Sequence, residues 1–223
     1  MSDLARPLNS TLAFGHLTPD GVLDALESVG LRGDGRILQL NSYENRVFQV
    51  MLEDGRAVVA KFYRPGRWSD AQILEEHDFC LELAVAEVPV MAPLPLELSL
   101  ERARPGQSSR LEGAQQTLLH WSDGTHAHRV SVSAYLGGRD PHVEADADWM
   151  RLGRLMGRVH AVGRKRRFEH RLKLQGSLAQ AAIDTLLALD VVDLSLRSRW
   201  EAVARDAAIA VARAFEQEPH LQT

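Results

Sequence analysis

Three short runs of strand-forming residues, separated by turns of a few polar residues, constrain the fold of this chain more than any other feature. They occupy residues 37–40, 47–52 and 57–63. The turn between the last two runs contains Asp54 and Gly55, a pair typical of a tight β-hairpin. The spacing therefore predicts an antiparallel, three-stranded meander.

Helical patterns flank this meander on both sides. Thr18 is a suitable capping residue and Pro19 suits the first helical turn, which predicts a helix over residues 18–29. After the meander, Ser69 and Gln72 have the spacing of a capping box. A second helix is therefore expected to begin at residue 69.

The remainder of the chain changes from polar to strand-like to helical. Residues 97–128 are rich in Arg, Gln, Ser and Gly, and they predict a loop or long hairpin around one short strand at 117–120. A strand is expected at 129–135, and Gly137 and Gly138 then interrupt the pattern. Helical periodicity occupies residues 146–162, 177–189 and 195–217.

These elements predict an α+β fold, with an antiparallel sheet in the first part of the chain and helices alone in the second. We expect a sheet-bearing lobe over residues 1–136 and a linker over 137–145, where the two glycines lie. Residues 146–223 are expected to form the helical part.

Composition excludes several classes of function. The 26 basic and 30 acidic residues give a formal net charge of −4, which argues against a nucleic-acid partner. No apolar run reaches the ~20 residues that span a bilayer, and the first residues do not resemble a secretion signal. We therefore expect no membrane partner and a cytoplasmic location. The single cysteine, Cys80, cannot form an internal disulfide or complete a thiolate metal site. The oligomeric state stays unknown.

The most informative polar residues are a lysine in the third strand and an acid on the following helix. Alternation along the strand places Lys61 on the same face as Val59 and Tyr63. A lysine on such a face commonly keeps its ammonium in water, so Lys61 alone is a weak signal. Helical periodicity directs Glu76 toward the sheet and Glu75 toward the opposite side, where it needs only solvent. Because two half-buried charges are costly unless paired, we expect an ion pair between Lys61 and Glu76.

The turn before the second strand could contribute to anion binding. Residues 41–45, Asn-Ser-Tyr-Glu-Asn, are turn formers that can direct backbone N–H groups and the Ser42 hydroxyl at an anion. They include no glycine, and an ordinary connection between strands explains these five residues, taken alone, better than an anion site does. A positioned lysine under such a turn is the arrangement with which protein kinases bind ATP phosphates.

Longer segments carry a family resemblance. They are NSYENRVFQV at 41–50, VVAKFYRPGRWSDAQILEEHDF at 58–79, VPV at 88–90 and GRLMGRVHAVGRK at 153–165. In these segments the chain resembles the bacterial stress-response serine/threonine protein kinases of the aminoglycoside-phosphotransferase-like superfamily. The similarity covers roughly residues 14–170, with an unmatched insertion near 97–128.

The resemblance implies a protein-kinase-like fold, in which an antiparallel sheet lobe with one αC-type helix precedes a helical lobe that is incomplete in this chain. It implies ATP and Mg²⁺ as cofactors. The residues that it assigns to ATP binding are Ser42, Asn45, Lys61 and Glu76. Glu75 is the alternative to Glu76, and residues 132–138 are similar to the hinge that receives adenine.

The chain also departs from the family pattern. The family carries a catalytic loop of the form His-Gly-Asp-x-His-x-x-Asn, followed by a metal-binding Asp, and this string does not occur in the 223 residues. We therefore assign no catalytic residue and no metal ligand here. At most weak ATP binding, and no turnover, is expected from this polypeptide alone.

Three functions follow from this reasoning. The first is an ATP-dependent serine/threonine protein kinase of the bacterial stress response, with a protein substrate for the complete enzyme. The second is a small-molecule kinase of the same superfamily, acting on an aminoglycoside, choline or homoserine. The third is a non-catalytic nucleotide- or partner-binding module that uses the apolar side of the last helix, although core residues are the more ordinary explanation of that side. Its apolar residues are Leu196, Trp200, Val203, Ala207, Ile209 and Val211.

Overall fold

The computed structural model describes residues 14–99, 106–138, 143–173 and 176–217. The described residues divide into two compact units, one that continues to Arg171 and one that begins at Leu172. The first contains a six-stranded antiparallel sheet and helices α2, α3 and α4, and the second contains helices α5 and α6. The α+β fold predicted from the sequence is confirmed.

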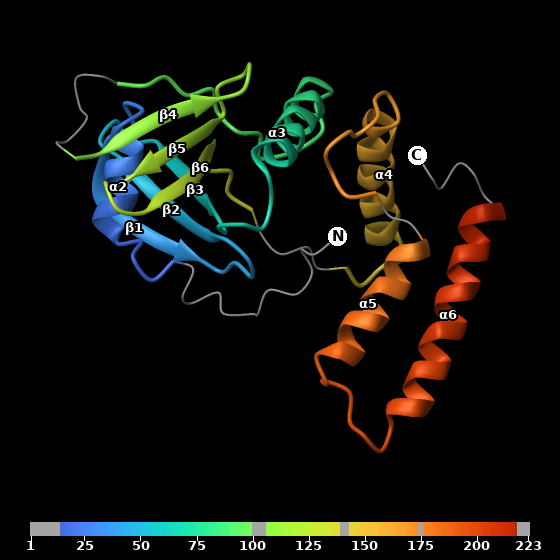
Figure 1. Ribbon diagram of the computed structural model, residues 1–223. Helices are drawn as coiled ribbons and strands as arrows, with labels where there is room; N and C mark the ends of the chain where they lie inside the picture. Colours follow the sequence, from blue (N-terminus) through green and yellow to red (C-terminus); the bar gives the residue numbers. More distant parts are fainter. Residues whose placement is uncertain (1–13, 100–105, 139–142, 174–175, 218–223) are drawn as a thin grey trace. The chain divides into compact units, whose positions relative to one another are not determined.

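The sheet has the strand order β1-β2-β3-β6-β5-β4 (Figure 1). Its strands are β1 Gly33–Leu40, β2 Arg46–Leu52, β3 Ala57–Tyr63, β4 Ser108–Glu112, β5 Leu118–Ser122 and β6 Ala127–Ala134. The predicted meander is confirmed, because β1, β2 and β3 pair antiparallel in sequence order. β6 pairs with the other side of β3, so β3 lies inside the sheet with a neighbour on each side.

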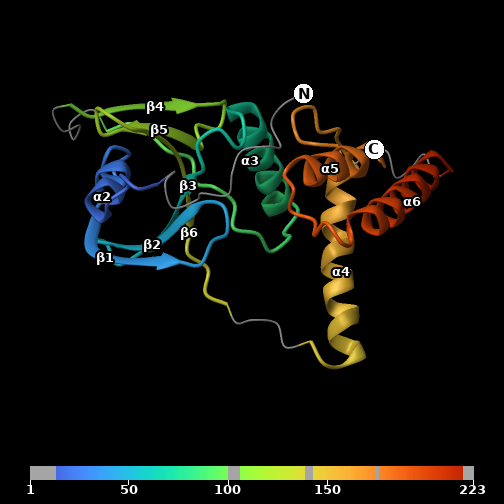
Figure 2. The ribbon, with the colours of Figure 1, turned by 60° about the horizontal axis from the view of Figure 1, so that its bottom comes forward.

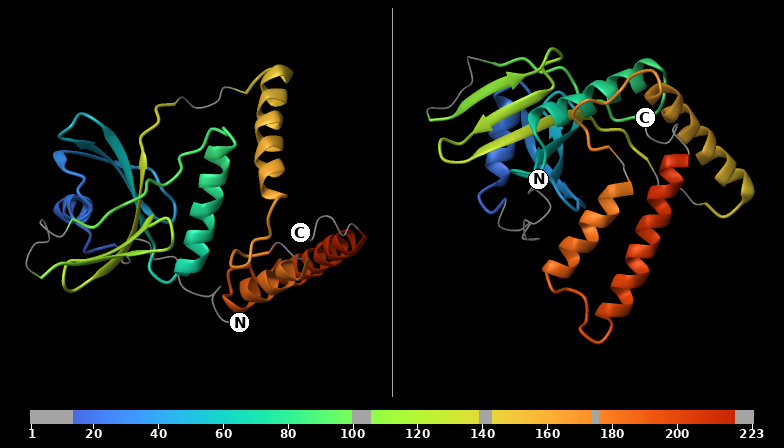
Figure 3. Two further views of the ribbon diagram at one scale, coloured as in Figure 1. Left: turned by 90° about the horizontal axis from the view of Figure 1, so that it is seen from above. Right: turned by 45° about the vertical axis from the view of Figure 1, so that its right-hand side comes forward.

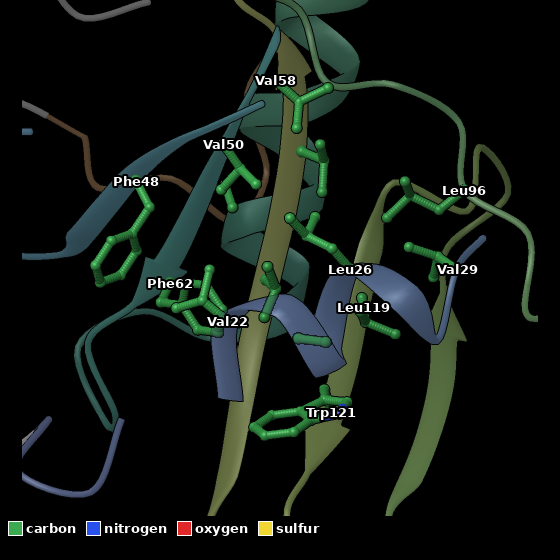
Figure 4. Close-up of a cluster of buried hydrophobic side chains, with 14 of the residues drawn as sticks. Val22, Leu26, Val29, Phe48, Val50, Val58, Phe62, Leu96, Leu119 and Trp121 are labelled. Atoms are coloured by element: carbon green, nitrogen blue, oxygen red, sulfur yellow. The ribbon is translucent and has the colours of Figure 1, made fainter. Parts of the chain in front are cut away.

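One face of the sheet is covered by helix α2 (Pro19–Glu27). The Thr18 hydroxyl caps this helix by accepting the N–H of Gly21 at 3.1 Å. Val22 and Leu26 of α2 are fully buried in the main hydrophobic core, against the strand residues that point to this face (Figure 4). Burial of this apolar surface is the main force that holds α2 on the sheet.

The opposite face is covered by helix α3 (Asp70–Val85), so the sheet lies between α2 and α3 (Figure 3). The predicted capping box is present, because Ser69 Oγ accepts from the N–H of Gln72 and Gln72 Oε1 accepts from the N–H of Ser69. Ile73 of α3 packs with Tyr63 of β3 and with Leu118 at the start of β5. β3 therefore presents Val58, Ala60 and Phe62 to α2, and its alternate residues to α3.

The polar region 97–128 contributes two strands, although the sequence predicts one. β4 and β5 form a hairpin that extends the sheet at its edge. β4 is a half-exposed edge strand of sequence SSRLE, so it lacks the apolar alternation by which a strand is recognised. The turn depends on Gly113, which has a φ of +85° and stands so close to Leu74 that a Cβ atom would lie 2.7 Å from its side chain.

Helix α4 (Asp146–Gly163) belongs to the same compact unit and packs against the C-terminal half of α3 (Figure 2). Leu83 and Val88 pack with Val162 of α4 in a small buried cluster. The compact unit thus continues past the predicted linker at 137–145, of which residues 139–142 lie outside the described residues. A lobe boundary at that linker stays a prediction.

The second unit is a helical hairpin of α5 (Gly176–Ala188) and α6 (Arg197–Gln217). Ile183 of α5 and Ala208 of α6 are buried, and Arg205 of α6 forms a 3.1 Å ion pair with Asp184. Large apolar side chains such as Val203 are exposed. None of the helices within the described ranges is both long enough and apolar enough to span a membrane.

Candidate functional site

Lys61 and Glu76 form the ion pair that the sequence predicts. Lys61 lies in the middle of β3 on the face toward α3, and its Nζ atom is 3.2 Å from Oε1 of Glu76. The two side chains are 30% and 34% exposed. The pair is therefore shielded enough to need mutual neutralisation and open enough to meet a ligand from solvent.

Burial and neighbouring groups act on the Lys61 ammonium in opposite directions. Burial lowers the pKa of Lys61, whereas Tyr63 and Glu76 raise it, and the resulting pKa is above the ordinary value for lysine. The ammonium also lies 4.6 Å from the centre of the Tyr63 ring, within the range of a cation–π interaction. Lys61 is therefore positively charged at neutral pH and able to bind an anion.

Glu76 binds a second cation that the sequence analysis does not identify. Arg171, in the segment after α4, donates from Nη1 to Oε2 of Glu76 at 2.9 Å, while Lys61 binds Oε1. Its guanidinium also lies 4.5 Å from the centre of the Trp68 ring. Arg171 is 95 residues from Glu76 along the chain, so no local spacing connects the two. The basic stretch that begins at Arg164 is the only sequence signal near it.

The expectation that Glu75 needs only solvent is wrong. Its side chain is 4% exposed, and its carboxylate accepts the backbone N–H groups of Glu169, His170 and Arg171, the last two at 2.9 and 2.6 Å. Burial raises the pKa of this carboxyl, but the three N–H donors outweigh it and hold the pKa below its usual value. Helical periodicity gave the correct side of the helix, but it could not show that the segment after α4 covers that side.

A buried hydrogen-bonded network lies behind the ion pair. The Tyr63 hydroxyl is 2.8 Å from Nε2 of His77 and 3.1 Å from Oγ of Ser131, and Nδ1 of His77 is 2.8 Å from Oγ1 of Thr117. All four side chains are buried. Burial lowers the pKa of His77 to about 4, so its ring is neutral at pH 7. The network ties the end of β3 to α3, and so fixes the strand that carries Lys61.

A cavity of about 200 Å³ opens beside these groups on the α3 face of the sheet. Its lining combines the charged pair with serine, methionine and apolar residues: Val47, Val59, Lys61, Tyr63, Glu76, His77, Cys80, Met91, Pro93, Ser131 and Ser133. Burial raises the pKa of the Cys80 thiol, so this cysteine is not activated as a nucleophile. Chemically, the cavity offers one ammonium to an anion and a largely apolar wall to the rest of a ligand.

The turn at residues 41–45 joins β1 to β2 and is tied to the connection between β3 and α3. Oδ1 of Asn45 accepts the backbone N–H of Arg64 at 3.2 Å. Glu44 forms an ion pair with Arg67 and accepts from Nε1 of Trp68 at 3.4 Å. Ser42 is half-buried, and neither Ser42 nor Asn45 is among the residues that line the cavity. Their role in ATP binding stays a prediction.

The segment predicted to receive adenine, residues 132–138, begins within β6, the strand that also carries Ser131. Within it, the carbonyl of Val132 accepts the N–H of Leu94 at 2.7 Å, and the N–H of Tyr135 donates to the carbonyl of Ala57 at 3.0 Å. Gly137 and Gly138 are exposed. In the described part of the chain, no three His, Cys, Asp or Glu side chains converge on a position that could hold a metal ion.

The family model and the most similar curated relatives agree on the protein family of this chain. The model of the phosphotransferase enzyme family matches residues 36–222. Stress response kinase A of Escherichia coli O157:H7 is 42% identical over 163 residues, which are 73% of this chain and 43% of that protein. The serine/threonine protein kinase RdoA of Salmonella typhimurium is 38% identical over the same length.

Among solved structures, the amicoumacin kinase hAmiN, in complex with AMP-PNP, Ca²⁺ and Ami, matches with a TM-score of 0.49 and 18% sequence identity. The match covers 78% of this chain and 54% of that one. The chain spans about 43% of the length of the curated relatives it matches.

Proposed function

Because the chain belongs to the phosphotransferase enzyme family, we propose that it binds ATP, and that the complete enzyme transfers a phosphoryl group from ATP to serine or threonine residues of a protein. The observation that carries this proposal is the Lys61–Glu76 ion pair at the edge of the cavity. The relatives named as stress response kinase A and as a serine/threonine protein kinase support a protein substrate and a role in the bacterial stress response.

In this proposal Lys61 neutralises the phosphates of ATP. Its ammonium is held by Glu76, which leaves its remaining N–H donors for phosphate oxygens. Phosphoryl transfer depends mainly on positioning and charge stabilisation, so a lysine fixed in place contributes more than a freely moving one. Ser42 would donate its hydroxyl to a phosphate, and Asn45 would support the turn through its bond to Arg64.

No step is assigned to a metal ion or to a general base. Mg²⁺ accompanies ATP in such reactions, and the described residues include no group of three or more His, Cys, Asp or Glu side chains placed to hold a metal ion. The family's catalytic string is likewise absent from the sequence. We therefore expect these 223 residues to bind ATP without turning it over, and γ-labelled ATP incubated with the chain and a mixture of acceptor proteins should yield no labelled protein.

We also propose a cytoplasmic location, because ATP is the expected substrate and is supplied there. The composition, with a net charge of −4, supports the further proposal that nucleic acid is not a partner.

Titration calorimetry of the 223-residue chain with ATP tests the proposed function. Lys61→Ala should weaken ATP binding by about tenfold or more, since a hydrogen bond between charged groups contributes roughly 1.5–3 kcal/mol. The matched control is Lys165→Ala, because Lys165 is an exposed lysine of the same compact unit. ATP affinity that is equal in Lys61→Ala and in the unmodified chain would overturn the proposal, as would an unmodified chain that binds no ATP.

A further inference from the structure

The Glu76 carboxylate is shared between two cations, one from strand β3 and one from the segment after α4. Oε1 of Glu76 binds the ammonium of Lys61 at 3.2 Å, and Oε2 binds the guanidinium of Arg171 at 2.9 Å. Two positive groups and one negative group leave a net charge of +1 at this position. Without Arg171 the same position would be neutral, and Glu76 would be free to bind Lys61 with both oxygens.

Arg171 is fixed at both its backbone and its side chain. Its N–H donates to the buried carboxylate of Glu75 at 2.6 Å, next to the residue that its guanidinium binds. The guanidinium also stacks over Trp68, where cation and ring are 4.5 Å apart. Its side chain is 30% exposed. A cation held at three points loses little conformational freedom when a ligand arrives.

Trp68 continues the chain of contacts to the turn at residues 41–45. The Trp68 indole donates to Glu44 of that turn at 3.4 Å, and Arg67 both pairs with Glu44 and lies 4.4 Å from the Trp68 ring. The ring of Trp68 thus contacts two guanidinium groups. Through this ring, Arg171 connects the lysine that is proposed to bind phosphate with the turn that is proposed to cover it.

We propose that Arg171 is a positioning residue, which acts through Glu76 and Trp68 to hold Lys61 and the turn at residues 41–45 ready for the phosphates of a nucleotide. The inference rests on the proposed function, because it names a residue that would prepare the same site. It goes further in assigning to the segment after α4 an influence on phosphate binding, and therefore on the discrimination between phosphorylated and unphosphorylated ligands.

The test compares ATP with adenosine, which has no phosphate. ATP affinity is measured by calorimetry and adenosine affinity by ligand-observed NMR, using the full 223-residue chain. Arg171→Ala should weaken ATP binding about tenfold, because the site loses one charge and one charge-assisted contact. Adenosine binding should change less than about twofold. Arg171→Lys should recover most of the ATP affinity, since it restores the charge.

Arg167→Ala is the matched control, because Arg167 is an exposed arginine of the same segment. The Arg167→Ala variant should bind ATP with the affinity of the unmodified chain. An equal loss of ATP and adenosine affinity in Arg171→Ala would indicate a general structural role and overturn the inference. The inference would also be overturned if Arg171→Ala bound ATP as tightly as the unmodified chain while Lys61→Ala bound it more weakly. Both of these outcomes would leave the proposed function intact. If Arg171→Ala fails to fold, Arg171→Gln decides by the same comparison. An unmodified chain that binds no ATP overturns the inference and the proposed function together.

Discussion

Replacement of Glu75 by glutamine should release the segment after α4 from helix α3. The Glu75 carboxylate accepts three backbone N–H groups, from Glu169, His170 and Arg171. Glutamine has nearly the same shape, but it offers one acceptor oxygen and replaces the other by an NH₂ donor. With its oxygen toward His170 and Arg171, the variant would direct that NH₂ group at the N–H of Glu169, which is also a donor.

The magnitude follows from these three bonds. Two of them change from charge-assisted to neutral, at a loss of about 1 kcal/mol each, and the third is lost at about 1.5–3 kcal/mol. Glu169 and His170 are exposed, so water takes over part of the lost bonding and reduces the total. A loss of about 3 kcal/mol is expected, which corresponds to roughly a hundredfold change in the equilibrium between closed and open segment.

Amide hydrogen exchange measures this opening directly. The amides of residues 169–171 should exchange about a hundredfold faster in Glu75→Gln than in the unmodified chain at pH 7. Glu82→Gln is the control, because Glu82 is also on α3 and pairs with Arg166 at 2.8 Å, but it is 42% exposed. A surface ion pair of this kind contributes at most about 1 kcal/mol, so exchange should change less than about fivefold.

The same amides should respond to acid in the unmodified chain. Since the pKa of folded Glu75 is lower than the ordinary 4.5, protection should be complete above pH 4.5 and should be lost as the pH falls through that lowered pKa.

Exchange rates in Glu75→Gln within threefold of the unmodified chain would refute this reasoning, because they would show that the three N–H groups do not depend on the carboxylate.

Further predictions concern the network and the turn. Urea unfolding should show that stability falls between pH 6.5 and 4, with up to about 3 kcal/mol of the fall due to His77, because burial keeps His77 neutral in the folded state while the unfolded chain takes up a proton. His77→Gln should lack this share of the fall, and the part due to the half-buried His120 and the buried His128 should remain. Tyr63→Phe should cost about 1–2 kcal/mol in the same assay, whereas the exposed Tyr135→Phe should cost none. Asn45→Ala should speed protease cleavage within residues 41–45 severalfold, unlike the exposed Asn41→Ala, and equal cleavage of the two variants would contradict a role for Asn45 in holding the turn.

The part of the site that could be predicted from the sequence depends on local periodicity. A period of two places Lys61 on the α3 face of β3, and helical periodicity turns Glu76 toward it, so two neighbouring elements suffice to predict the pair. The Ser69 capping box and the hairpin turn at Asp54 are equally local, and both are present. Each of these features is encoded within about 15 residues, which is the separation of Lys61 and Glu76.

The features that could not be predicted depend on distant or backbone partners. Glu75 binds N–H groups, which every residue except proline carries, so its partners have no sequence signature. Arg171 is 95 residues from Glu76, and one arginine among several basic neighbours does not reveal which acid it binds. His77 lies in α3, and the helical periodicity of α3 does not predict its contact with Thr117, which is 40 residues away. Strand β4 is polar because it lies at the sheet edge, where apolar alternation is not required.

Glu75 and Glu76 are adjacent carboxylates on α3, and the geometry of a helix explains why their partners differ. Successive residues of a helix are rotated by about 100°, so Glu75 and Glu76 cannot both face the sheet. One binds the backbone after α4 and the other binds β3, and Arg171 joins both because its N–H donates to Glu75 while its side chain donates to Glu76. Rotation of α3 about its axis would break both sets of bonds at once. The distance between Lys61 and Glu76 consequently depends on the segment after α4 as well as on the packing of α3 against the sheet.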